Sequence, residues 1–100
     1  MLKVVLCCGS GASSGFMAQA IKRAAKKKGL EIEVTARSET LLESFLDQTD
    51  VILIAPHLAA ESEMIAKRCQ PVPAVVIDRM VYGTLDGEKA LELIRKVLGE

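Results

Sequence analysis

Hydrophobic residues in this chain form short continuous runs, separated by stretches with helical periodicity. The predicted strands lie at about Lys3–Cys7, Glu31–Ala36, Val51–Ala55 and Ala74–Ile77. The third and fourth runs are continuously apolar, which is typical of strands covered on both faces of a sheet. The second run alternates Ile32 and Val34 with polar neighbours, and it therefore predicts a half-buried edge strand.

Between these runs, apolar residues recur every three or four positions, the spacing of an α-helix that is buried on one side. The predicted helices lie at about Ser14–Lys28, Ser38–Leu46, Ala59–Cys69 and Gly87–Leu98. We expect the first helix to bury a stripe that includes Phe16 and Met17. We expect the third helix to bury Met64 and Ile65.

Strands that alternate with helices at this spacing form a parallel sheet with helices on both faces. Right-handed crossovers leave few topologies, and we expect a flavodoxin-like doubly wound α/β fold with four strands in the order 2-1-3-4. The length of 100 residues fits one domain, residues 1–100. Ligands of such sheets bind beyond the carboxyl ends of the strands, near the switch point between strands one and three. The loops at 8–14, 56–62 and 78–83 should meet there.

The composition argues against several kinds of partner. The 13 basic residues balance 13 acidic ones, so no net charge attracts nucleic acid or an anionic membrane. No apolar run is long enough to span a bilayer, and we expect no signal peptide before the first strand. Three cysteines, two of them adjacent, do not suggest a disulfide framework and favour the reducing cytoplasm. With one histidine and no cluster of ligands, we expect no metal and no cofactor.

The most informative segment begins at Cys8, where the first strand meets a run of glycine, serine and alanine. The glycines allow tight turns that point backbone N–H groups inward, and the helix that follows adds its positive dipole end. Both features favour a thiolate or a phosphorylated thiol at Cys8. The expected phosphate-binding residues are Gly9, Ser10, Gly11, Ala12, Ser13, Ser14 and Gly15. Cys7 lies on the opposite side of the strand and is expected to be a core residue.

Several thiol chemistries use a cysteine in this position. A low-molecular-weight tyrosine phosphatase or a related arsenate reductase places arginine six residues after the cysteine, where this chain has Ser14. Hydrolysis of a phosphate ester would lack that cation. A phosphoryl carrier, which holds the group without hydrolysing it, fits the loop best. A thiol phosphatase or arsenate-reductase-like enzyme is one alternative, and a non-catalytic flavodoxin-like binding module is another.

Three parts of the chain resemble one known family. The Cys8–Ser14 loop is similar to the Cys-x-x-Gly-x-Ser-Thr/Ser loop of the enzyme IIB component of the bacterial sugar phosphotransferase system, in its lactose/cellobiose (chitobiose) class. Ala55–His57 resembles the Gly-Pro-Gln segment of that family. Val76–Asp78, Tyr82–Gly83 and Asp86–Gly87 resemble its Val-Ile-Asp, Tyr-Gly and Asp-Gly run. The resemblance extends over nearly the whole chain.

The resemblance implies a cytoplasmic transferase with a phosphocysteine at Cys8. The donor would be a phosphohistidine of a IIA component. The acceptor would be a hydroxyl of a lactose-, cellobiose- or chitobiose-type sugar, held by the membrane-embedded IIC component. We expect a monomer that meets these partners transiently.

Other residues are candidates for supporting roles around Cys8. His57, Asp78 and Tyr82 could line the phosphoryl site, and each could equally have a structural role. Arg79 could supply a cation near the site, although a solvated arginine is the simpler interpretation. The candidate docking residues at the rim are Phe16, Met17, Leu58 and Met80.

Overall fold

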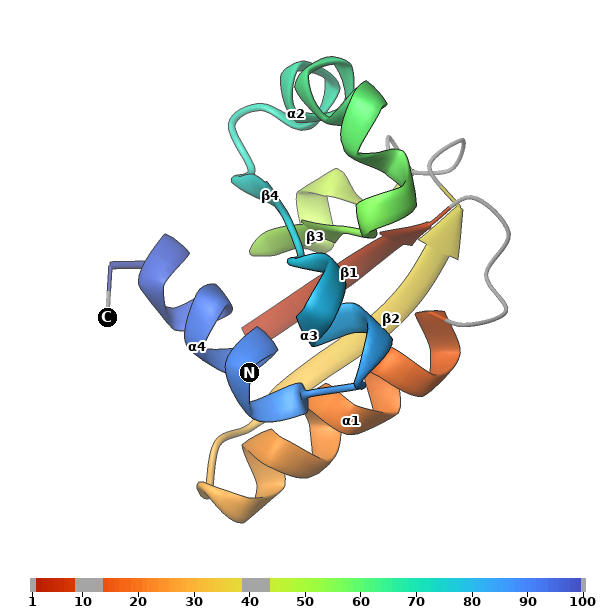
Figure 1. Ribbon diagram of the computed structural model, residues 1–100. Helices are drawn as coiled ribbons and strands as arrows, with labels where there is room; N and C mark the ends of the chain where they lie inside the picture. Colours follow the sequence, from red (N-terminus) through yellow and green to blue (C-terminus); the bar gives the residue numbers. More distant parts are fainter. Residues whose placement is uncertain (1, 9–13, 39–43, 100) are drawn as a thin grey trace.

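The sheet of this protein has four parallel strands (Figure 1). A computed structural model describes residues 2–8, 14–38 and 44–99. The strands are β1 (Leu2–Cys8), β2 (Ile32–Ser38), β3 (Val51–Ile54) and β4 (Ala74–Val76). Their order in the sheet, β2-β1-β3-β4, confirms the predicted flavodoxin-like doubly wound arrangement.

The helices occupy the connections between the strands. The α-helices are α1 (Ser14–Lys27), α2 (Ser62–Cys69), α3 (Arg79–Gly83) and α4 (Gly87–Val97), and the 3-10 helices are η2 (Leu46–Gln48) and η3 (Pro56–Glu61). The first and last predicted helices are confirmed. The third predicted helix is confirmed only from Ser62 onward, because the preceding residues form η3. Pro56 opens η3, a position where its missing N–H group costs no helical hydrogen bond.

The helix predicted at Ser38–Leu46 is wrong at both of its described ends. β2 continues through Ser38, which pairs with Cys8 of β1, and Leu46 begins a three-residue 3-10 helix. Residues 39–43 lie outside the described residues. The physical reason is the parallel pairing of β2 with β1, which extends to Ser38. Pairing between segments that are distant in the sequence overrides the local helical periodicity.

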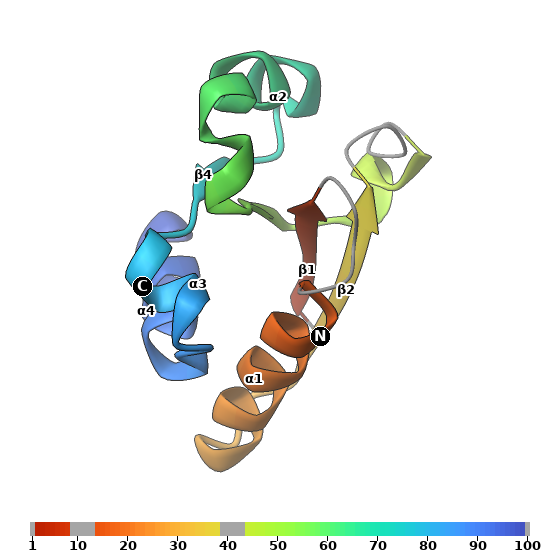
Figure 2. The same ribbon diagram turned by 45° about the vertical axis from the view of Figure 1, so that its right-hand side comes forward.

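Side-chain alternation along β1 divides the core between the two faces of the sheet. Val4 and Leu6 belong to a cluster with α1 and α4, whereas Val5 and Cys7 belong to a cluster with α2. Figure 2 shows α1 and α4 on one side of the sheet and α2 on the other. The predicted cover of helices on both faces is therefore confirmed, and Cys7 is a core residue as expected.

Two side chains that were expected in the core are exposed. Phe16 is 68% exposed and Met64 is 57% exposed. Met17, which was also expected in the buried stripe of α1, is fully buried, and it lies one helical step of about 100° from Phe16. In α2 the buried residues are Ile65 and Cys69, one turn apart, so Met64 is turned away from the sheet.

The helices α1 and α4 approach each other closely at Gly87, the first residue of α4. A Cβ atom at Gly87 would overlap the backbone carbonyl group of Ala20 in α1. Glycine therefore allows the two helices that cover one face of the sheet to pack directly against each other. Asp86 caps α4 at the same point, where its Oδ1 accepts a hydrogen bond from the Lys89 N–H at 3.1 Å.

We predict that Gly87→Ala lowers the free energy of unfolding by about 1–3 kcal/mol, because the new methyl group forces α4 away from α1. Urea denaturation measures the change. The matched control is Gly83→Ala, whose Cβ would meet open space and should change the free energy by less than about 0.5 kcal/mol. Equal losses in the two variants would contradict this description of the helix contact.

Candidate functional site

Cys8 is the last residue of β1, a strand with neighbours on both sides. It pairs with Ser38 of β2, and its side chain is only 2% exposed. The Cys8 Sγ–H group donates a hydrogen bond to the backbone carbonyl oxygen of Arg37, with an Sγ···O distance of 3.6 Å. Because side chains alternate along a strand, Cys8 lies on the face of α1 and Cys7 on the face of α2.

Part of the predicted phosphate-binding loop lies outside the described residues. This part contains Gly9, Ser10, Gly11, Ala12 and Ser13. Ser14 and Gly15 form the start of α1, as predicted. Figure 1 shows this end of α1 at the same edge of the sheet as the end of β1. The positive end of the helix dipole is thus at the edge where Cys8 lies.

The structure brings together two of the other predicted site residues. His57 follows β3 in η3, and Tyr82 follows β4 in α3. Their ring centroids are 6.3 Å apart, with the rings at 71° in an edge-to-face arrangement. Two of the three loops that were expected to meet beyond the carboxyl ends of the strands are therefore in contact. His57 is exposed and Tyr82 is half-buried beside the α1–α4 core.

Asp78 has a defined structural contact at the start of α3. Its Oδ1 accepts a hydrogen bond from the Met80 N–H at 2.7 Å, which is the geometry of a helix N-cap. Asp78 was expected either to line the phosphoryl site or to have a structural role, and its hydrogen bond with Met80 supports the structural role. The cap fixes the turn between β4 and α3 and so holds the loop that carries Tyr82.

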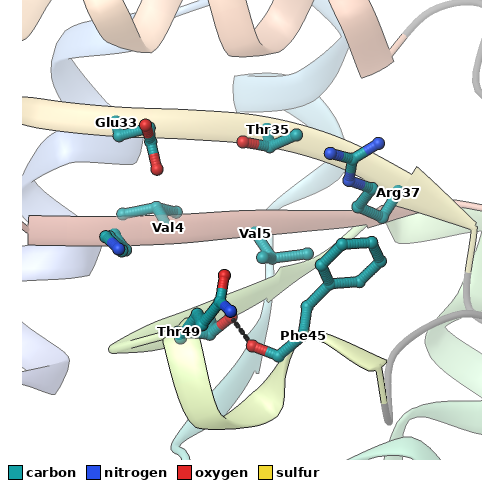
Figure 3. A pocket seen from close by; sticks show the side chains of 9 residues that line it. Val4, Val5, Glu33, Thr35, Arg37, Phe45 and Thr49 are labelled. Atoms are coloured by element: carbon teal, nitrogen blue, oxygen red, sulfur yellow. Dashed lines mark hydrogen bonds between the residues drawn. The ribbon is translucent and has the colours of Figure 1, made fainter.

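Sequence reasoning missed a contact between β2 and the segment that follows it. The guanidinium carbon of Arg37 lies 4.6 Å from the centroid of the Phe45 ring, a cation–π geometry. Figure 3 shows Arg37 above this ring, and a hydrogen bond between the Thr49 hydroxyl and the Phe45 carbonyl oxygen. No sequence signal pointed to this contact, because residues 38–46 were interpreted as a helix.

Arg37 and Phe45 line a polar cavity of about 110 Å³ on the sheet face opposite α1. The cavity lies over β1 and β2, and Val4 and Val5 of β1 line it together with the ring of Phe45 (Figure 3). The other residues that line it are Lys3, Glu33, Thr35, Gln48 and Thr49. It therefore contains two cationic side chains and one carboxylate.

Residues 2–8, 14–38 and 44–99 contain no group of three or more His, Cys, Asp or Glu side chains that could hold a metal ion. In the same part of the chain, no helix has the length and apolar character needed to cross a membrane.

Comparison with known proteins finds that the chain as a whole is similar to one family. Residues 3–93 match the family described as "PTS system, Lactose/Cellobiose specific IIB subunit". The chain is 31% identical over 94 residues to the oligo-beta-mannoside-specific EIIB component of the PTS system of Bacillus subtilis, with 92% of this chain and 91% of that protein covered. The solution structure of a cellobiose-specific phosphotransferase IIB component protein from Borrelia burgdorferi has a TM-score of 0.79 at 32% identity, and the match covers 96% of this chain and 90% of that chain.

A third relative is a much longer protein. It is the lactose-specific EIICB component of the PTS system of Streptococcus mutans, 32% identical to this chain over 60 residues. The match covers 60% of this chain and 11% of that protein.

Proposed function

The chain belongs to the lactose/cellobiose-specific IIB family of the phosphotransferase system, and we propose that Cys8 is the residue that carries the phosphoryl group. The observation that supports this assignment is the position of Cys8. It ends an inner strand at the switch point of the sheet, immediately before the segment that leads into the amino end of α1. Cys7 and Cys69, the other two cysteines, are buried in the core on the α2 side.

The transfer consists of two displacements at phosphorus. In the first, Sγ of Cys8 attacks a phosphohistidine of the donor. An S–P bond forms, the N–P bond breaks with its electron pair on the imidazole, and the thiol proton passes to that nitrogen. In the second, a sugar hydroxyl oxygen attacks the same phosphorus. The S–P bond then breaks with its electron pair on sulfur, and the hydroxyl proton restores the thiol.

The task of the protein in both steps is positioning and charge neutralisation. We assign the phosphoryl oxygens to the backbone amides and hydroxyl groups of residues 9–15, next to the positive end of α1. His57 and Tyr82, in contact at the same edge, are assigned to the wall of the site on the side of β3 and β4. Asp78 supports that wall through its cap on α3.

The partners follow from the family. We assign the donor phosphohistidine to a IIA component, and the acceptor to a sugar of the lactose, cellobiose or chitobiose type bound by a membrane-embedded IIC component. The name EIICB of the Streptococcus mutans relative supports the pairing with a IIC component. A monomer in the cytoplasm suits transient contact with both partners, and three buried thiols suit a reducing compartment.

Two exposed apolar side chains at the carboxyl edge of the sheet are suited to docking the IIA component. Phe16 lies in the first turn of α1 and is 68% exposed, and Met80 is the second residue of α3 and is 71% exposed. Large exposed apolar side chains are candidates for partner contacts. Met17 is fully buried and Leu58 packs against the α2-side core, so neither belongs to this docking surface.

We predict that incubation with a phosphorylated IIA component adds one phosphoryl group to the wild-type chain, detected by intact mass spectrometry. Cys8→Ser should abolish this adduct, because the transfer needs the sulfur nucleophile at the end of β1. Cys7→Ser is the matched control and should retain the adduct, since Cys7 is buried on the other face. Loss of the adduct in Cys7→Ser with retention in Cys8→Ser would refute the assignment.

We also predict that Phe16→Ser or Met80→Ser raises the KM for the phosphorylated IIA component about fivefold to tenfold, with little change in kcat. Steady-state transfer rates at varied donor concentration measure both constants. Met64→Ser is the matched control, because Met64 is 57% exposed on α2, the helix that covers the other face. An increase in KM of equal size for Met64→Ser would argue against docking through Phe16 and Met80.

A further inference from the structure

We propose that Leu85 and the groove beside it extend the surface on which the IIA component docks. The inference rests on the proposed function and deepens it, because it adds a second contact to the docking through Phe16 and Met80. The groove lies between α1 and the start of α4, and its volume is about 250 Å³. Pockets for small molecules usually measure about 300–1,000 Å³, so side chains of a protein partner suit this groove better.

Leu85 has a backbone conformation that leucine rarely adopts. It lies between α3 and α4 with a φ of 54°, in the left-handed region. The Leu85 N–H donates to the Tyr82 carbonyl oxygen at 3.2 Å, and the Asp86 N–H donates to the Val81 carbonyl oxygen at 3.0 Å. These two bonds form a Schellman motif, in which glycine usually occupies the position of Leu85 because a Cβ atom disfavours the left-handed region. The backbone of this turn therefore does not explain the leucine.

The hydrophobic core does not explain the leucine either. Leu85 is 42% exposed, and none of the three apolar clusters of the described residues includes it. Val81 and Tyr82, which lie shortly before it in the chain, do pack against the α1–α4 core. An exposed apolar side chain in an unfavourable backbone conformation indicates contact with a partner.

The groove continues the exposed face of α1 on which Phe16 lies. Ala20 and Arg23 line the groove, and both lie within about 40° of Phe16 around the helix axis, because one turn has 3.6 residues. Figure 1 shows the segment between α3 and α4 beside the middle of α1, where Gly87 meets the backbone of Ala20. A partner that covers Phe16 therefore reaches the groove by extending about 10 Å along α1.

The charges of the groove favour a partner segment that brings a carboxylate. Arg23 and Lys27 line it on α1, and Asp86 and Glu88 line it at the start of α4. The Asp86 Oδ1 already accepts the Lys89 N–H, and both carboxylates lie at the positive end of the α4 dipole. The two cations form no ion pair within the described part of the chain. The groove is therefore complementary to an apolar side chain of the IIA component with a carboxylate beside it.

The experiment measures kcat and KM for transfer from a phosphorylated IIA component to this chain, at low and at high salt. Leu85→Asn should raise the KM about fivefold or more with little change in kcat, because asparagine tolerates the left-handed backbone but removes the apolar side chain. Arg23→Glu should raise the KM by a similar factor at low salt, and this increase should become smaller at high salt.

Two controls separate the groove from a general effect of surface changes. Lys22→Glu reverses the neighbouring exposed charge of α1, outside the groove, and should change the KM less than about twofold at low salt. Leu85→Gly gives the Schellman motif its usual residue. It should raise the KM as Leu85→Asn does, while its urea midpoint stays equal to that of the wild type or increases.

An unchanged KM in Leu85→Asn and Arg23→Glu overturns the inference. So does an increase of equal size in Lys22→Glu, because the effect would then come from the overall charge of α1. If these variants instead slow only the transfer from phosphorylated Cys8 to sugar in vesicles that contain the IIC component, the assignment of the groove to the IIA component is wrong. Absence of any phosphoryl group on wild-type Cys8 would refute the proposed function itself, so the two failures are distinguishable.

Discussion

The pairing of β1 with a parallel strand on each side is the constraint on which the rest of the structure depends. Residues Leu2 to Cys8 pair with β2, and Val4 to Cys7 also pair with β3. This double ladder fixes the direction of every β1 side chain, so that alternate residues fill the two cores. It also determines where the strand ends, and a thiol at that end lies at the same edge of the sheet as the loops that follow β3 and β4.

The same ladder explains the separate environments of two adjacent cysteines. Cys7 is directed into the α2-side core, while Cys8 occupies the last position, where its sulfur reaches the carbonyl group of Arg37. A phosphoryl carrier needs such a fixed sulfur position at the edge of the sheet. In our account, the amides of the loop and the positive end of α1 stabilise the phosphoryl group until the next partner removes it.

Most of the fold and the position of Cys8 could be predicted from the sequence, because they depend on local patterns. Apolar runs, helical spacing and the glycine-serine loop each have a recognisable signature within a few residues. The contact between Arg37 and Phe45 could not be predicted in this way, since it forms only when the chain after β2 folds back over the sheet. The exposure of Phe16 and Met64 was missed because each lies at the border of an apolar stripe, next in sequence to a buried residue. The helical spacing of apolar residues does not show which of two adjacent apolar side chains faces the core.

The central claim is that the phosphoryl group is bonded to the sulfur of Cys8, and not to His57 at the same edge of the sheet. The most direct measurement is the phosphorus NMR spectrum of the singly phosphorylated chain, in the wild type and in His57→Gln. The account predicts a phosphorus–sulfur resonance in both proteins. A phosphorus–nitrogen resonance in the wild type that disappears in His57→Gln would contradict it.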